Sequence, residues 1–169
     1  MSDRPLHAPW RMDYIRSLEH PKENECFLCA AASATTDQEK RDRLVLWTTE
    51  HSVVLINRYP YTNGHLLIAP RQHIAELEQL PDDVANDMTR QTTRGLTLLK
   101  RAISPQGFNI GINLGRCAGA GLPGHIHQHV VPRWAGDTNF MSVIGHVRVV
   151  PQAMSQLYDE LMTVHSQIR

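Results

Sequence analysis

The chain has 169 residues, of which 41% are hydrophobic and 20% are charged. This composition fits one globular domain over 1–169 and excludes a wholly disordered chain. Seventeen basic residues balance seventeen acidic ones, so the net charge gives no support for a polyanionic partner such as duplex DNA. The sequence holds no apolar run of the ~18 residues that a membrane span requires, and it starts without the apolar core of a secretory signal. We therefore expect a soluble, cytoplasmic protein with no membrane partner.

The first part of the chain predicts an arm, a short helix and three strands. Three prolines interrupt residues 1–25, which we expect to form an irregular N-terminal arm. The Ala-rich stretch 26–34 is typical of a short helix, which is expected to fade into the charged residues that follow. Strand-like apolar runs lie at 44–48, 53–57 and 65–69, separated by turn-forming residues, and a proline is expected to stop the third.

The second part of the chain predicts a long helix, two further strands and a closing helix. A proline followed by two acidic residues marks a helix start, and an apolar face then continues over 81–103. Residues 108–114 and 125–131 are strand-like and flank a Gly-rich loop at 115–124, while 152–168 predicts a closing helix. Strands and helices that occur in separate groups predict an α+β fold with a mostly antiparallel sheet of about five strands.

Three alternating histidines are the most informative feature of the sequence. On a strand, His125, His127 and His129 would line one face. Imidazole rings make a poor apolar core because their nitrogens need polar partners, but they can attack phosphorus, move a proton near neutral pH or ligate a metal. A triple-histidine metal site stays open, although same-face neighbours ~6.6 Å apart are widely spaced for three ligands of one ion.

The Gly-rich loop before these histidines is a candidate phosphate-binding element. Its glycines allow positive φ angles, so backbone amides can point at phosphate oxygens. The loop matches neither the P-loop pattern nor the dinucleotide-binding pattern. Ordinary nucleotide triphosphatases and Rossmann enzymes therefore lose support.

Cysteine usage points to a metal more than to a disulfide. The chain has three cysteines, and Cys26 and Cys29 form a Cys-x-x-Cys pair. In a reducing compartment this spacing favours metal ligation or redox chemistry. The plainer interpretation is that both are buried helix residues, as free cysteines often are. Cys117 is a loop thiol to which we assign no role.

Two motifs in the expected order resemble those of the histidine-triad (HIT) family. Residues 125–131 fit the family's triad of alternating histidines, and 57–70 is similar to its upstream segment. Asn113 and the glycines that follow it fall where the family's phosphate-binding loop lies. The resemblance covers 26–140 and implies a HIT-like fold with a long central helix and a C-terminal helix. Gln128 departs from the apolar residue that is usual there, and it should face away from the chemistry.

The resemblance also implies an activity. Residues 132–140 look like the branch that cleaves dinucleoside polyphosphates such as diadenosine tetraphosphate, and the preceding loop is similar to that of bacterial diadenosine tetraphosphate phosphorylases. These enzymes pass through a covalent nucleotidyl-histidine intermediate, with water or phosphate as acceptor and no catalytic cofactor. Gly121 stands where such phosphorylases tend to carry a serine, so the acceptor stays open.

Residue roles follow from matched positions. His127 would attack the α-phosphorus as a neutral imidazole, with its second nitrogen held by a carbonyl or other acceptor. His129 would bind phosphate oxygens or assist the leaving group, and His65 would support the cluster. Residues expected to bind substrate, through ribose or phosphate, are Asn57, Asn113, Ala120 and Gly121, together with His129.

Some relatives carry a structural zinc ion and pair as homodimers that extend one sheet across both subunits. The zinc ligands of those relatives correspond here to Cys26, Cys29, His73 and His125. Two thiolates and two imidazoles make a closed tetrahedral site. We therefore expect a structural zinc ion and a homodimer.

Three other functions stay open. One is a nucleoside phosphoramidase or another nucleotidyl transferase on the same scaffold, which differs in its leaving group. Another is a non-catalytic nucleotide-binding module, although a pure binder does not need a nucleophile between two further histidines. The third is a zinc-dependent hydrolase, whose activity would vanish with the metal. No specific nucleic-acid binding is expected, because the sequence lacks a stripe of aromatic and basic residues.

Overall fold

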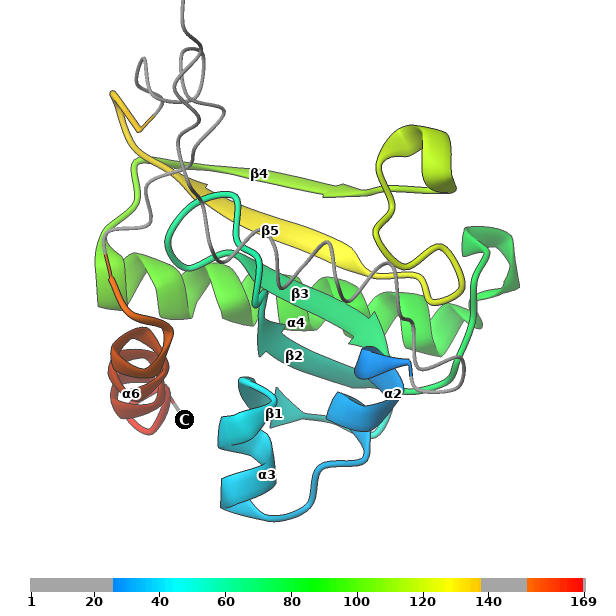
Figure 1. Cartoon of the computed structure of the whole chain (residues 1–169), viewed down its shortest axis with the longest axis horizontal. Coiled ribbons are helices and arrows are strands. Elements are labelled where there is room, and N and C mark those ends of the chain that lie inside the picture. Colours follow the sequence, from blue (N-terminus) through cyan, green and yellow to red (C-terminus); the bar gives the residue numbers. More distant parts are fainter. Residues whose placement is uncertain (1–25, 138–151, 169) are drawn as a thin grey trace, which may run out of the picture.

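The computed structural model describes residues 26–137 and 152–168 (Figure 1). Five strands form one antiparallel sheet in the order β1-β2-β3-β5-β4, which confirms the predicted α+β fold. The strands are β1 (Val45–Thr48), β2 (Ser52–Ile56), β3 (Leu66–Pro70), β4 (Gly107–Ile112) and β5 (Gln128–Arg133). The helices are α2 (Phe27–Ala32), α3 (Asp37–Asp42), α4 (Asp82–Ile103) and α6 (Met154–His165), with 3-10 turns at Leu77–Gln79 and Arg116–Ala118. The expected arm at 1–25 and the end of the 132–140 segment lie outside the described residues.

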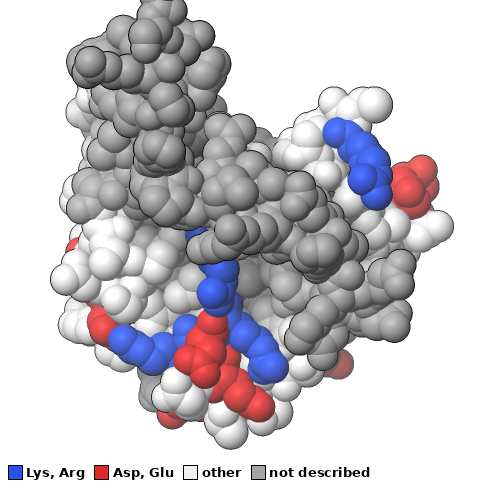
Figure 2. Space-filling view, in the orientation of Figure 1, with Lys and Arg blue, Asp and Glu red and all other residues white. Residues whose placement is uncertain are grey.

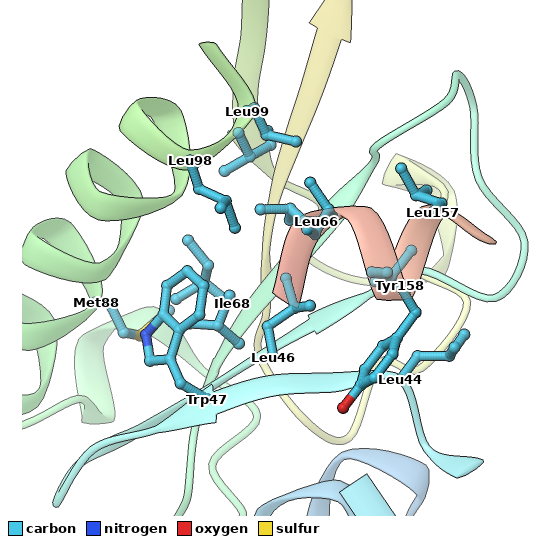
Figure 3. Close-up of a cluster of buried hydrophobic side chains, with 14 residues drawn as sticks. Leu44, Leu46, Trp47, Leu66, Ile68, Met88, Leu98, Leu99, Leu157 and Tyr158 are labelled. Carbon is cyan, nitrogen blue, oxygen red and sulfur yellow. The ribbon is translucent and has the colours of Figure 1, made fainter. Parts of the chain in front are cut away.

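The main hydrophobic core lies between one face of the sheet and helices α4 and α6 (Figure 3). Leu66 and Ile68 of β3 point into it beside Leu98 and Leu99 of α4, and all four are almost fully buried. The alternate residues of β3 face the other way, and Leu67 packs with α2 in a second, smaller cluster. Because His129 pairs with Leu67, its side chain lies on the sheet face that is opposite α4.

A tight loop between β2 and β3 places His65 directly before β3. Gly64 in this loop has a φ of +78°, and a Cβ there would lie 2.5 Å from Cδ1 of Ile103 at the end of α4. Only glycine allows both this backbone conformation and this close approach. The loop therefore sits directly against α4, and His65 follows with no exposed surface.

Two elements differ from the sequence-based expectation. The charged stretch after α2 is not a fading helix end but a separate helix, α3, which starts with a capping box in which Thr36 and Glu39 satisfy each other's backbone amides. Strand β5 starts at Gln128 and not at His125, because the amide of Ile126 donates to the carbonyl of Ile74 (2.7 Å) and so leaves the sheet ladder.

Two prolines lie in the strands, and β3 ends at Pro70 as expected. Pro70 is the last residue of β3, opposite Ser52, and Pro132 lies inside β5. A proline loses only its amide donor, and its carbonyl still accepts. The Pro132 carbonyl accepts from the hydroxyl of Thr62 (2.8 Å).

The charge balance of the sequence recurs on the surface. Figure 2 shows Lys and Arg side chains next to Asp and Glu side chains on the face that it presents, and Arg41 forms an ion pair with Asp159. Among the described helices, none combines the length and the apolar character that crossing a bilayer demands.

Candidate active site and metal centre

The side chain of His127 is held in one tautomer by the backbone. Its Nδ1 lies 2.8 Å from the carbonyl oxygen of His125. Because a carbonyl oxygen only accepts hydrogen bonds, Nδ1 carries the proton and Nε2 carries the lone pair. Burial lowers the pKa of His127, although its hydrogen bond to the His125 carbonyl opposes this shift. The ring is therefore an uncharged imidazole with a nucleophilic Nε2.

His65 and His129 form a second hydrogen-bonded unit with a fixed direction. The amide of Tyr61 donates to Nδ1 of His65 (3.1 Å), so the proton of a neutral His65 sits on Nε2. That Nε2 lies 2.9 Å from Nδ1 of His129 and donates to it. His129 consequently presents a protonated Nε2 on its outer side.

His129 is also uncharged near neutral pH. Burial, with a smaller effect from neighbouring His127, lowers the pKa of His129 to about 4. The rings of His127 and His129 meet edge to face, with centroids 5.0 Å apart. The site therefore brings a lone pair on one ring close to an N–H donor on the next.

Both predicted substrate-binding asparagines lie beside these histidines. The side-chain amide nitrogen of Asn113 is 3.4 Å from Nε2 of His129, and phosphate binding by Asn113 stays a prediction. Asn57 directs its amide nitrogen at Nδ1 of His65 (3.2 Å), and its oxygen accepts from the amide of Tyr59 (3.0 Å). Asn57 thus supports His65, and its contact with ribose stays a prediction.

The Gly-rich loop has the backbone conformation that its sequence suggested. Gly115 and Gly119 have φ angles of +76° and +88° and flank the 3-10 turn. The amide of Ala120 donates to the carbonyl of Gly115 (3.3 Å). Phosphate binding by Ala120 and Gly121 stays a prediction.

The four predicted zinc ligands lie together. The ligand atoms of Cys26, Cys29, His73 and His125 are all within 4.8 Å of one another. Nδ1 of His125 is 3.1 Å from Sγ of Cys26, and Nδ1 of His73 is 3.2 Å from Sγ of Cys29. A tetrahedral zinc ion would separate such ligand atoms by roughly 3.3–3.8 Å. The spacing of this centre is therefore close to what zinc needs.

The protonation states also fit a metal. Nε2 of His125 donates to the carbonyl of Pro70 (2.9 Å), which leaves the Nδ1 lone pair directed at the thiols. Burial raises the pKa of the Cys29 thiol to about 11, and neighbouring Cys26 adds to the shift. Both thiols are free. A bound cation would offset the cost of ionising Cys29 in this buried position, because metal ligation requires the thiolate form.

The three triad histidines therefore have different partners. His125 joins the cysteines, His127 bonds to the main chain, and His129 bonds to His65. This division removes the geometric basis for a triple-histidine metal site. A metal ion needs three or more His, Cys, Asp or Glu side chains with their ligand atoms close together. Within residues 26–137 and 152–168, the Cys–His centre is the one group that meets this condition.

Comparison with known proteins places this geometry in a family. The model of the HIT domain matches residues 38–136, more than half of the chain. The chain belongs to the HIT family. This result confirms the resemblance that the triad and the upstream segment had indicated.

Several HIT relatives are similar over more than half of the chain. The AP-4-A phosphorylase of Mycobacterium tuberculosis is 35% identical over 151 residues, which are 88% of this chain and 77% of that protein. The bis(5'-nucleosyl)-tetraphosphatase (asymmetrical) of Schizosaccharomyces pombe is 29% identical over 93 residues, which are 55% of this chain and 50% of that protein. The crystal structure of a Zn-bound histidine-triad protein from Mycobacterium smegmatis matches with a TM-score of 0.66 and 26% identity, covering 85% of this chain and 95% of that one.

The sequence analysis gave no role to Tyr61, which contacts two histidines of this HIT site. The ring of Tyr61 stacks on His129 at 5.8 Å between centroids and lies 4.7 Å from the ring of His65. Tyr61 also fixes His65 through its backbone amide. Any residue type except proline offers that amide, so only the position four residues before a buried histidine could have signalled its role.

Proposed function

We propose that the protein cleaves dinucleoside polyphosphates such as diadenosine tetraphosphate, with His127 as the nucleophile. The observation that carries this proposal is the hydrogen bond from Nδ1 of His127 to the His125 carbonyl, which leaves Nε2 as a lone-pair donor. The names of the M. tuberculosis phosphorylase and the S. pombe tetraphosphatase support this class of substrate.

The reaction follows from the two tautomers. Nε2 of His127 forms a bond to the α-phosphorus, and the bond from that phosphorus to the bridging oxygen breaks, so the leaving nucleotide takes the electron pair. The His127 ring becomes a nucleotidyl imidazolium whose Nδ1–H still donates to the His125 carbonyl. Nε2–H of His129 donates to a phosphate oxygen where negative charge increases. The acceptor oxygen then forms a bond to phosphorus and its proton passes to bulk solvent, while the bond between phosphorus and Nε2 breaks and its electron pair returns to Nε2.

Product analysis tests this function and identifies the acceptor. Diadenosine tetraphosphate is incubated with wild type and with His127→Ala, with and without inorganic phosphate. AMP plus ATP in both conditions means that water is the acceptor, whereas ADP plus ATP only with phosphate means a phosphorylase. Wild type that cleaves no dinucleotide contradicts the proposal, and activity on an adenosine phosphoramidate would then favour the phosphoramidase.

We also propose a structural zinc ion and a homodimer. Zinc is supported by the spacing of the Cys–His centre and by the Zn-bound relative, and metal analysis of the purified protein should find one zinc per chain.

The homodimer is supported by the position of β4 at the edge of the sheet. This strand pairs with β5 on one side, lies at the end of the strand order and exposes 45% of Ile110. Light scattering of wild type and Ile110→Lys tests the dimer, and a monomeric wild type contradicts it.

A further inference from the structure

The nucleophile lies on a segment that the sheet does not hold. His127 precedes the first residue of β5, so ladder hydrogen bonds do not fix its position. Two contacts, one from the last residue of β3 and one from the segment that follows it, anchor it instead. The amide of Ile126 donates to Ile74 (2.7 Å), and Nε2 of His125 donates to Pro70 (2.9 Å).

The same segment supplies one side of the metal centre. His73 lies between Pro70 and Ile74, and its ring meets the ring of His125 edge-on at 4.9 Å between centroids. His125 therefore has contacts in three directions. Its Nδ1 points at the thiols, its Nε2 donates to the Pro70 carbonyl, and its own carbonyl accepts a hydrogen bond from Nδ1 of His127.

We propose that the Cys26–Cys29–His73–His125 centre positions the nucleophile, in addition to supporting the fold. This inference rests on the proposed function, because it assigns a role to the centre in that reaction. A centre closed by four ligands fixes the ring of His125 and the loop that carries His73. The His125 carbonyl then stays in place and selects the Nδ1–H tautomer of His127. His125 is thus a positioning residue that acts through His127.

The neighbouring histidine provides an internal contrast. His129 lies on β5, pairs with Leu67 and Gly111 across the sheet, and bonds to His65. None of these contacts passes through the metal centre. Loss of the centre should therefore disturb His127 while His129 keeps its place, so the rate of the chemical step falls and nucleotide binding persists. Partners that orient reactive groups around metal sites typically change activity by roughly 10–100-fold.

His73→Ala is the variant that tests the proposal. His73 is an exposed ligand at the edge of the centre, so its removal disturbs packing least. His73→Cys offers a fourth ligand of the right chemistry and serves as the conservative rescue. His51→Ala is the matched control, because His51 is a loop histidine that pairs with Asp83 outside the site.

Four quantities are measured on each protein: zinc content, kcat on diadenosine tetraphosphate, Kd for a non-hydrolysable analogue, and the long-range ¹H–¹⁵N spectrum of His127. Wild type, His51→Ala and His73→Cys should bind zinc and show one His127 tautomer with the proton on Nδ1. His73→Ala should lose zinc, show a mixture of His127 tautomers and lose roughly 10-fold or more in kcat. Its Kd should change less than threefold.

The outcomes separate the two proposals. A folded, zinc-free His73→Ala that keeps the Nδ1–H tautomer and a kcat within twofold of wild type overturns the positioning role and leaves the proposed function intact. Wild type that cleaves no dinucleotide overturns the proposed function, while the spectra still report on the tautomer. If His73→Ala does not fold or keeps its zinc, zinc is added in steps to chelated wild type. The fraction of His127 that carries its proton on Nδ1 should then rise with bound zinc, and so should kcat per folded molecule. A kcat equal to that of wild type before zinc binds overturns the proposal.

Discussion

The carbonyl oxygen of His125 lies 2.8 Å from Nδ1 of His127, which leaves Nε2 as the nucleophilic nitrogen of the His127 ring. His127→Ala removes that nitrogen and should lower kcat by on the order of 10³-fold or more, while the fold and nucleotide binding remain. Gln128→Leu is the matched control, because Gln128 faces α4, where its Oε1 is 3.0 Å from the Thr92 hydroxyl. Near-normal turnover by His127→Ala would rule out this residue as the nucleophile.

Removal of His65 should slow the reaction through His129. His65→Phe keeps the ring volume but takes away the N–H that donates to Nδ1 of His129, so the Nε2–H tautomer of His129 is no longer selected. A lost hydrogen bond at a buried position costs about 1–3 kcal/mol, which predicts a decrease in kcat/KM of roughly 10–100-fold. Steady-state kinetics with a thermal melt as folding control checks this, and an unchanged kcat/KM would mean that His129 needs no such donor.

The lowered pKa of His129 predicts how stability depends on pH. Its value is about 4 in the folded protein and about 6.5 in an unfolded chain. Between these values the unfolded state binds more protons, so stability decreases as pH falls from about 6.5 toward 4. His129→Gln should lose less stability over the same range. Urea unfolding of both proteins at several pH values measures the difference, and parallel curves would contradict the assigned shift.

Gly64→Ala should destabilise the protein substantially. The added Cβ would be 2.5 Å from Cδ1 of Ile103 at a φ of +78°, which combines backbone strain with overpacking and predicts a loss of about 2–4 kcal/mol. Gly107→Ala is the control, since a Cβ at Gly107 meets nothing within 4 Å. Urea unfolding compares the two, and equal stabilities would mean that the loop can move away from α4.

Local patterns in the sequence predicted much of the fold. Helix α4 was predicted over 81–103 and runs from Asp82 to Ile103, because a proline, an acidic first turn and an apolar face all mark it. Helix α3 was missed although its signal is also local, since Thr36 and Glu39 have the spacing of a capping box. The start of β5 has no local signal, because the acceptor that removes Ile126 from the ladder lies on Ile74, far away in the sequence.

The candidate site shows the same division. Residue type and spacing brought out the histidines and cysteines, because imidazoles and thiols carry chemistry that a core does not need. The roles of Tyr61 and Pro70 depend on a backbone amide and a backbone carbonyl. Nearly every residue type offers these groups, so only the folded chain shows which of them are used.

The hydrogen bonds from Tyr61 through His65 to His129 run in one direction, and this direction limits how protons can move. The series begins at a backbone amide, which does not release its proton at ordinary pH. No proton can therefore enter His129 from the protein interior through His65. A proton that left Nε2 of His129 would have to be replaced from the substrate or from bulk water. The three groups form a closed end of the site and not a proton wire.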